Sequence, residues 1–192
     1  DKPRWLKNRA AFSASKITQM QAAYKDQCRS LLAVDDGVAR IVAALQAKDP
    51  GLANTIILFT SDQGVENGVH MQAAKKVPWD ASAKLPFAIR ADGVRGTEAP
   101  AMDSDLVLNI DLAPTILELT GVAGDETDGD SLVPILDGTV TDWRDLLLIE
   151  HGSMGPKDPS FCEARTERFM FTAHADKTFE FYDLALDPYE LQ

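Results

Sequence analysis

Side chains able to bind a cation and an anion occur close together in one stretch of the chain. Asp62 and Gln63 directly follow a short apolar run, and His70 and Lys75 come next on the same connection. In open α/β sheets, ligands bind just beyond the carboxyl ends of the strands. Asp62 and Gln63 offer oxygen donors, which suit a hard cation such as calcium better than zinc. Lys75 can bring a positive charge back to the same place.

Each of these residues also has an ordinary structural explanation. Asp-Gln-Gly after a strand is most often a turn, in which Gly64 lets the backbone bend sharply. A lysine on a loop is usually solvated, and a single histidine such as His70 is usually a packed or exposed loop residue. The chemistry therefore depends on which elements surround these residues and where they place them.

A long helix is predicted over residues 13–48, because apolar residues recur there at steps of three and four. Cys28 lies on this apolar stripe and is predicted to be a buried thiol. Asp35 and Asp36 are adjacent within the same helix, so their side chains point in different directions, which is typical of a solvated helix surface.

Two short strands and a second helix follow the long helix. Residues 54–60 and 85–90 are apolar runs without alternation, typical of strands buried on both faces of a parallel sheet. A helix is predicted to begin at Asp111 as its N-cap, to tolerate Pro114 in its first turn and to stop at Gly121. The order helix, strand, strand, helix indicates an α/β layer.

The last quarter of the chain has a different pattern, with short β-prone runs separated by tight turns. It predicts a small antiparallel sheet, with one turn at His174–Lys177. We therefore expect two units, an α/β part over residues 1–140 and an antiparallel subdomain over residues 141–192. The strand candidates are residues 146–150, 164–173 and 178–182.

Composition narrows the classes of partner. The 192 residues carry a net charge of −11, which argues against nucleic acid because phosphate backbones require basic patches. The longest apolar runs are far too short to cross a bilayer. The two cysteines, Cys28 and Cys162, are far apart and form neither a disulfide framework nor a zinc-binding spacing.

The order of motifs resembles that of the sulfatase family. Its members typically carry Ser-Asp-(His, Asn or Gln)-Gly, then Gly-x-His, then a lysine followed by Tyr or Trp, then Arg-Val-Pro. The resemblance covers nearly the whole chain, and its N-terminal part looks most like N-acetylglucosamine-6-sulfatase-like and arylsulfatase-type enzymes. The matching segments are Ser61–Gly64, Gly68–His70, Lys75–Trp79, Lys84–Pro86, Asp111–Thr115 and Tyr182–Leu191.

The resemblance implies a fold, an activity and a set of roles. The fold is part of an alkaline-phosphatase/sulfatase-like sheet with flanking helices, plus a small C-terminal antiparallel sheet. The activity is calcium-dependent hydrolysis of sulfuric esters of sugars or aryl groups by a formylglycine nucleophile. By position, Asp62 and Gln63 match two calcium ligands, Lys75 the lysine that contacts the sulfate, and His70 a residue near the substrate rim. The family also suggests a periplasmic or secreted location.

Part of the family's machinery has no counterpart in this sequence. Neither Cys28 nor Cys162 lies in a Cys/Ser-x-Pro/Ala-x-Arg nucleophile motif, and nothing matches the family's remaining calcium aspartates. We therefore expect this chain to be a fragment of the enzyme that is inactive alone. We also expect it to expose an apolar sheet edge or face and to self-associate through that surface.

Besides a purely structural protein, two other functions remain open from the sequence. One is a phosphatase or phosphonate hydrolase of the same superfamily, although such relatives mostly bind two metals with additional His and Asp ligands. The other is a non-catalytic module that binds sulfated glycans through Lys75, Lys76 and Lys84. Calcium-independent binding of heparin-like ligands, abolished by reversing the charge of these lysines, would favour this module.

Overall fold

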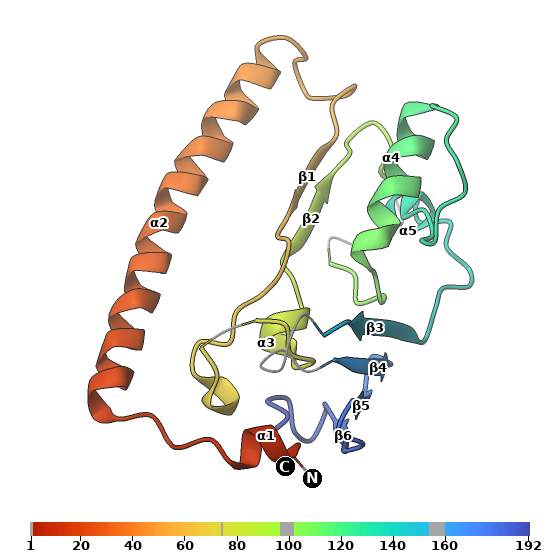
Figure 1. Ribbon diagram of the computed structural model, residues 1–192. Helices are drawn as coiled ribbons and strands as arrows, with labels where there is room; N and C mark the ends of the chain where they lie inside the picture. The colour runs from red at the N-terminus through yellow and green to blue at the C-terminus, as the bar shows by residue number, and fades with distance from the viewer. Residues whose placement is uncertain (1, 74, 97–101, 154–159) are drawn as a thin grey trace.

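The computed structural model describes residues 2–73, 75–96, 102–153 and 160–192 (Figure 1). A long helix flanks a two-stranded sheet, and a four-stranded sheet lies near both chain ends. The helices are α1 (Arg4–Lys7), α2 (Ala14–Gln46), α3 (Asp80–Ala83), α4 (Leu112–Thr120) and α5 (Val133–Asp137), with 3-10 turns at Val69–Met71 and Asn109–Asp111. The strands are β1 (Ile57–Thr60), β2 (Phe87–Arg90), β3 (Leu147–His151), β4 (Phe161–Arg165), β5 (Phe169–His174) and β6 (Phe179–Asp183).

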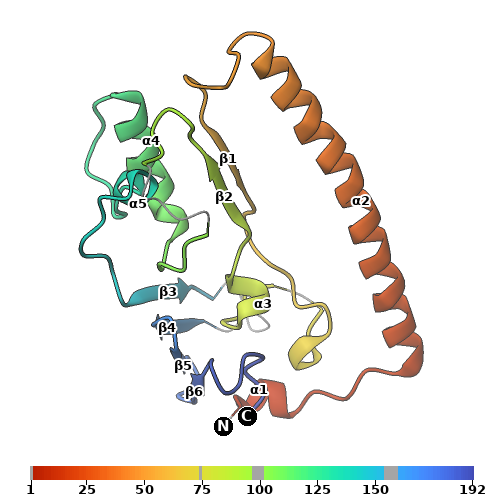
Figure 2. The ribbon, with the colours of Figure 1, turned by 180° about the vertical axis from the view of Figure 1, so that it is seen from behind.

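Helix α2 confirms the helix predicted from the apolar periodicity. Its N-cap is Ser13, whose hydroxyl oxygen accepts a hydrogen bond from the Lys16 N–H at 3.2 Å. None of its residues is buried, and both opposite views show it standing off from β1 and β2 (Figures 1 and 2). The prediction of a buried Cys28 is therefore wrong: this thiol is exposed, because none of the described residues covers it. Within the described residues, no helix is both long enough and apolar enough to span a membrane.

Strands β1 and β2 pair with each other in an antiparallel ladder, with Thr60 opposite Phe87. The predicted parallel pairing is therefore wrong for these two strands. Burial on both faces is also wrong, since Phe59 and Phe87 are 43% and 36% exposed. The exposure of these two rings confirms the expectation of an exposed apolar surface.

Helix α4 confirms the predicted helix and its stop signal. Pro114 lies in the first turn, and Gly121 follows the helix in the left-handed conformation at φ 65°. Such a positive φ is favoured by glycine, which has no Cβ to clash with the carbonyl.

Asp111 has a different role from the predicted cap of α4. Its carboxylate accepts hydrogen bonds from the backbone N–H of Leu108 at 2.7 Å and of Asp130 at 3.0 Å. Two further bonds, at 2.6 and 2.8 Å, come from the guanidinium of Arg144. Asp111 is fully buried, and it joins the start of α4 to the chain around α5 instead of capping the helix that follows it.

The C-terminal sheet confirms the predicted antiparallel sheet, with strand order β3-β4-β5-β6. The prediction of one strand over residues 164–173 is wrong, because the chain reverses there and forms two strands. In that reversal the Thr166 N–H donates to the Phe169 carbonyl at 2.8 Å. The predicted turn at His174–Lys177 is present, with the His174 N–H donating to the Thr178 carbonyl at 2.9 Å.

The two faces of this sheet differ in an unusual way. Side chains alternate between faces along a strand. The outward face carries exposed aromatic rings, whereas the inward face mixes apolar and polar groups that are buried. The outward rings are Phe169, Phe171, Phe179 and Phe181, and the inward residues of the same strands are Met170, Thr172, His174, Glu180 and Tyr182.

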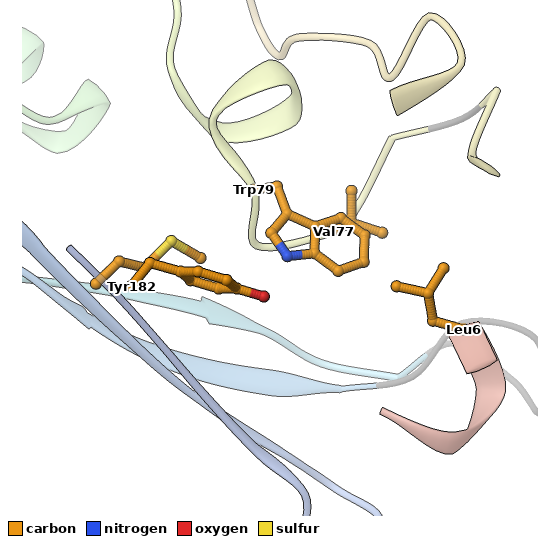
Figure 3. Close-up of a cluster of buried hydrophobic side chains, with 5 residues drawn as sticks. Leu6, Val77, Trp79 and Tyr182 are labelled. Carbon is orange, nitrogen blue, oxygen red and sulfur yellow. The ribbon is translucent and has the colours of Figure 1, made fainter. Parts of the chain in front are cut away.

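A compact apolar core lies against the inward face and draws on three parts of the chain. Figure 3 shows Trp79 between Tyr182 of the sheet on one side and Val77 and Leu6 on the other. Met170 completes this core. The core therefore joins α1, the segment before α3 and the C-terminal sheet. The division of the chain near residue 140 stays a prediction.

Candidate functional site

All four predicted site residues lie on the long connection from β1 to β2. The connection leaves the end of β1, passes a 3-10 turn and α3, and then enters β2 (Figure 1). Asp62 and Gln63 come at its start, His70 lies in the 3-10 turn and Lys75 precedes α3. The site's geometry is therefore decided by how this connection folds back on itself.

Asp62 and Gln63 lie immediately beyond the end of β1. Asp62 is exposed and Gln63 is half-buried, and the Gln63 Nε2 donates to Asp62 Oδ2 at 3.1 Å. The Ser61 hydroxyl donates to the Gln63 carbonyl at 3.0 Å. The two side chains therefore point to a common place with their polar ends together.

Gly64 fixes this corner of the loop against α3. Its N–H donates to the Ser82 carbonyl at 2.9 Å. A Cβ at Gly64 would lie 2.2 Å from the Ala81 carbonyl oxygen, which no side chain can accommodate without moving the backbone. Gly64 is absent from the positive-φ positions, so the predicted reason for this glycine is wrong. It is needed for close approach to α3 and not for a sharp turn.

The lysine segment is tied to the same residue of α3. The Lys76 N–H donates to the Ser82 hydroxyl at 3.1 Å, and Ser82 is only 6% exposed. Lys76 has a φ of 68°, a left-handed conformation that is unfavourable for a residue with a Cβ. Lys75, next to it, is exposed. One serine thus holds the backbone beside Gln63 and the backbone beside Lys75.

His70 lies deeper than the other three residues. Its ring stacks on Trp79 with ring centres 4.0 Å apart and planes 18° apart. The Lys2 Nζ lies 3.5 Å from its Nδ1, and Glu190 Oε2 lies 3.9 Å from its Nε2. His70 is 7% exposed and has a φ of 50°. The structure thus packs it into the base of the loop, and its role near the substrate rim stays a prediction.

A buried group of acidic side chains surrounds this base and was not predicted from the sequence. Glu66 is fully buried, and neither of its carboxylate oxygens has a hydrogen-bond partner among the residues that the structure describes. Burial raises the pKa of Glu66 to about 7, assisted by the charge of Glu190 and opposed by that of Lys2. Burial likewise raises the pKa of Glu163 to about 8, against the opposing charge of Arg165.

Glu180 is buried in the same region but has several partners. Its Oε1 lies 2.6 Å from the His174 Nε2, and its Oε2 accepts from the Trp79 Nε1 at 3.2 Å. The Tyr182 hydroxyl also donates to it. Burial acts to raise its pKa, but the hydrogen bonds from His174 and Tyr182 outweigh burial and leave the pKa lowered. The alternation of inward residues in β6 was the sequence signal that could have found Glu180 and Tyr182 together.

The donor set at the tip of the loop fits a hard cation in kind but is incomplete in number. Asp62 and Gln63 supply carboxylate and amide oxygens, whereas calcium takes about six to eight oxygen ligands. Among the described residues, no group of three or more His, Cys, Asp or Glu side chains is arranged to hold a metal ion. Asp62 and Gln63 are therefore only part of a calcium ligand set.

Comparison with protein families matches the two halves of the chain to related descriptions. The family described as Sulfatase matches residues 1–122, and the family described as N-sulphoglucosamine sulphohydrolase, C-terminal, matches residues 68–192. The chain is 34% identical over 157 residues to the N-acetylglucosamine-6-sulfatase of Homo sapiens. That alignment covers 79% of this chain and 28% of the human protein, so the chain spans less than a third of this relative.

Solved structures give the same picture. A protein in complex with its substrate D-glucosamine-2-N,6-O-disulfate is 29% identical, with a TM-score of 0.68, over 83% of this chain and 33% of that chain. The phosphonate monoester hydrolase of Agrobacterium radiobacter is 28% identical, with a TM-score of 0.70, over 83% of this chain and 34% of that chain. These similarities confirm the predicted alkaline-phosphatase/sulfatase-like fold class. With a family match over well more than half of its residues, the chain belongs to the sulfatase family.

Proposed function

We propose that this chain is part of a calcium-dependent sulfuric ester hydrolase that acts on sulfated sugars or aryl sulfates, with a formylglycine nucleophile outside these residues. The observation that carries the proposal is the double hold by Ser82. Its carbonyl accepts from the Gly64 N–H and its hydroxyl from the Lys76 N–H, so the backbone next to Gln63 and the backbone next to Lys75 are held by one residue. Two arms of the loop held in this way can act on a single bound anion.

Asp62 and Gln63 are the calcium ligands that this chain contributes. To bind the ion together they replace their mutual hydrogen bond, with the Gln63 amide turned so that its oxygen faces the ion. Bound calcium would supply positive charge that stabilises the sulfate oxygens as charge develops on them. Lys75 contributes a second positive charge, on a loop whose backbone is held beside it.

A sulfated sugar is favoured over an aryl sulfate as the substrate. The solved relative that binds D-glucosamine-2-N,6-O-disulfate and the human N-acetylglucosamine-6-sulfatase support this choice. The role of His70 at the edge of the sugar site is proposed from the family resemblance alone, because its ring is buried against Trp79. Export to the periplasm or out of the cell is proposed on the same grounds of family membership.

The test is turnover of a sulfate ester by the complete gene product. We expect Lys75→Ala to lower kcat by about 100-fold or more, as the loss of one charge-stabilising group typically does. Asp62→Ala is expected to cost a similar factor and to weaken calcium binding measured by calorimetry. Lys177→Ala, which removes an exposed lysine in the turn between β5 and β6, is the matched control and should leave turnover unchanged. Full activity in both Lys75→Ala and Asp62→Ala would refute these roles.

A phosphonate or phosphate ester hydrolase is the second candidate, favoured by the similarity to the phosphonate monoester hydrolase. The two candidates differ in the ester that the complete protein prefers. Comparing kcat/KM for 4-nitrophenyl sulfate and 4-nitrophenyl phenylphosphonate separates them. A ratio that favours the phosphonate by more than about tenfold, or 1.4 kcal/mol of transition-state stabilisation, would overturn the sulfatase assignment.

Self-association of the chain when produced alone is part of this proposal. Helix α2 presents large exposed apolar side chains, among them Leu31 and Leu32 at 59% and 68% exposure, and Phe59 of β1 is also exposed. An apolar surface of this extent is uncommon on a monomer and marks an interaction site. We propose that a second copy covers it in the isolated chain.

A further inference from the structure

Glu190 lies after the last strand, on the segment that leaves the C-terminal sheet, and its side chain is turned into the protein. It is 2% exposed and adopts a φ of 54°, an unfavourable conformation for a residue with a Cβ. Burial of a carboxylate is costly unless it is hydrogen-bonded or paired. Both features require compensation, and the contacts of Glu190 show where it comes from.

The first contact is with the start of α3. The Asp80 N–H donates to Glu190 Oε1 at 3.0 Å and lies 3.3 Å from Oε2. The first N–H groups of a helix have no partner within the helix. The residue at the N-cap position of α3 is Trp79, which makes no side-chain cap bond. Glu190 therefore supplies from far along the sequence the acceptor that this helix lacks locally.

The second contact is with His70, at the other end of the same loop. Glu190 Oε2 lies 3.9 Å from the His70 Nε2, and the ring of His70 stacks on Trp79 next to Asp80. In addition, the Lys2 ammonium donates to the backbone carbonyl of Glu190, which fixes its backbone in place. One buried carboxylate thus accepts a hydrogen bond from Asp80 and lies within 3.9 Å of His70, at the two ends of the loop of residues 70–80.

Lys75 lies midway along that loop and is exposed. Because both ends of the loop lie at one carboxylate, the loop backbone has less conformational freedom. It is therefore less able to move Lys75 away from Asp62. We propose that Glu190 is a positioning residue, which closes the base of the 70–80 loop and thereby fixes where Lys75 is presented to a bound anion. The identity of that anion rests on the proposed function. The role of Glu190 in closing the base of the loop does not.

The test uses the complete gene product and two readouts. In Glu190→Ala, kcat/KM for a sulfate ester should fall about tenfold, as expected for a slightly misplaced group. Calcium affinity should stay within about twofold, because Asp62 and Gln63 precede the loop and are held through Gly64. Limited trypsin cleavage after Lys75 and Lys76 should become about tenfold faster, since opening of the loop exposes it to the protease.

Two further comparisons separate positioning from general damage. Glu190→Gln keeps an oxygen that accepts from Asp80 and should stay within about threefold of the parent in both readouts. Glu167→Ala, on the exposed turn between β4 and β5, is the control and should change neither. Equal protease rates in Glu190→Ala and the parent would overturn the proposal. A matching loss of calcium affinity would also overturn it, because the effect would then not be confined to the loop.

A backbone variant covers the case in which Glu190→Ala does not fold. Asp80→Pro removes the N–H that Glu190 accepts, at a first helical position that tolerates proline. Asp80→Ala removes the same side chain, including its ion pair with Arg165, but keeps the N–H. Faster cleavage after Lys75 in Asp80→Pro than in Asp80→Ala supports the inference, and equal rates refute it. A parent that cleaves no sulfate ester defeats only the proposed function, because the protease readout does not depend on turnover.

Discussion

The region from α2 to β1 and the region around the C-terminal sheet bury their side chains in opposite ways. Along α2 no residue is buried, although apolar side chains recur on one face. Around Trp79, by contrast, α1, the loop before α3 and the C-terminal sheet enclose a core together with several charged groups. The region around the C-terminal sheet has a core of its own. The region from α2 to β1 has the apolar periodicity of a buried helix, but none of the described residues buries it.

The contrast indicates how the candidate site is supported. The loop of Asp62 and Lys75 begins at the uncovered β1, but its base at His70 and Trp79 belongs to the enclosed region. Its geometry is therefore set mainly by the C-terminal sheet and α3. The core does not extend to the outward face of that sheet, where Phe179 and Phe181 are 56% and 60% exposed.

The largest expected loss of stability comes from a substitution in the enclosed core. Trp79→Ala should destabilise the 192-residue chain by about 3–5 kcal/mol, because it leaves a large cavity and removes the donor to Glu180. Phe179→Ala, on the outward face of the same sheet, should cost less than about 1 kcal/mol. Urea unfolding followed by circular dichroism measures both. Similar losses in the two variants would remove the distinction between the faces.

A smaller effect concerns the buried Glu66. Its pKa is about 7 in the folded protein against 4.5 for the free side chain, so the folded state binds more protons between these values. Stability from this group is therefore fully present below pH 4.5 and is lost as the pH rises through 7, by about 3 kcal/mol.

Glu66→Gln removes that titration. We expect the variant to match the parent in free energy of unfolding near pH 4.5 and to exceed it at pH 8.5. The parent's own slope also includes Glu163, whose raised pKa acts in the same direction, so the difference between variant and parent is the informative quantity. Parallel pH profiles would show that Glu66 is ionised without penalty and is not enclosed as described.

The smallest effect lies on α2. Leu31→Ser should change the unfolding free energy of the isolated 192-residue chain by less than about 0.5 kcal/mol, because the side chain has little contact to lose. It should nevertheless reduce self-association in analytical ultracentrifugation, with Asp36→Ala as a control. In the complete gene product the same change should cost about 2 kcal/mol or more if another part covers the helix. An equally small cost in the complete gene product would mean that α2 is exposed to solvent in that protein as well.

Much of the local structure followed from residue patterns. Apolar periodicity located α2, and Gly121 marked the end of α4. Short β-prone runs with tight turns located the C-terminal sheet, apart from the reversal at Thr166, which carries no Gly or Pro to announce it. The motif order also indicated the sulfatase family, which the family match confirms. These features are determined locally, by side chains within a few residues of one another.

Burial, strand pairing and the support of the site depended on the tertiary structure. Cys28 lies on an apolar stripe, but only the fold shows that nothing described covers it. Nothing near Asp80 in sequence announces Glu190 as its acceptor, and nothing near Gly64 announces the carbonyl of Ser82. The sequence by itself determined which side chains could bind an anion or a cation. Which of them share a location was decided by contacts between segments far apart in the chain, because such contacts leave no periodic signal in either segment.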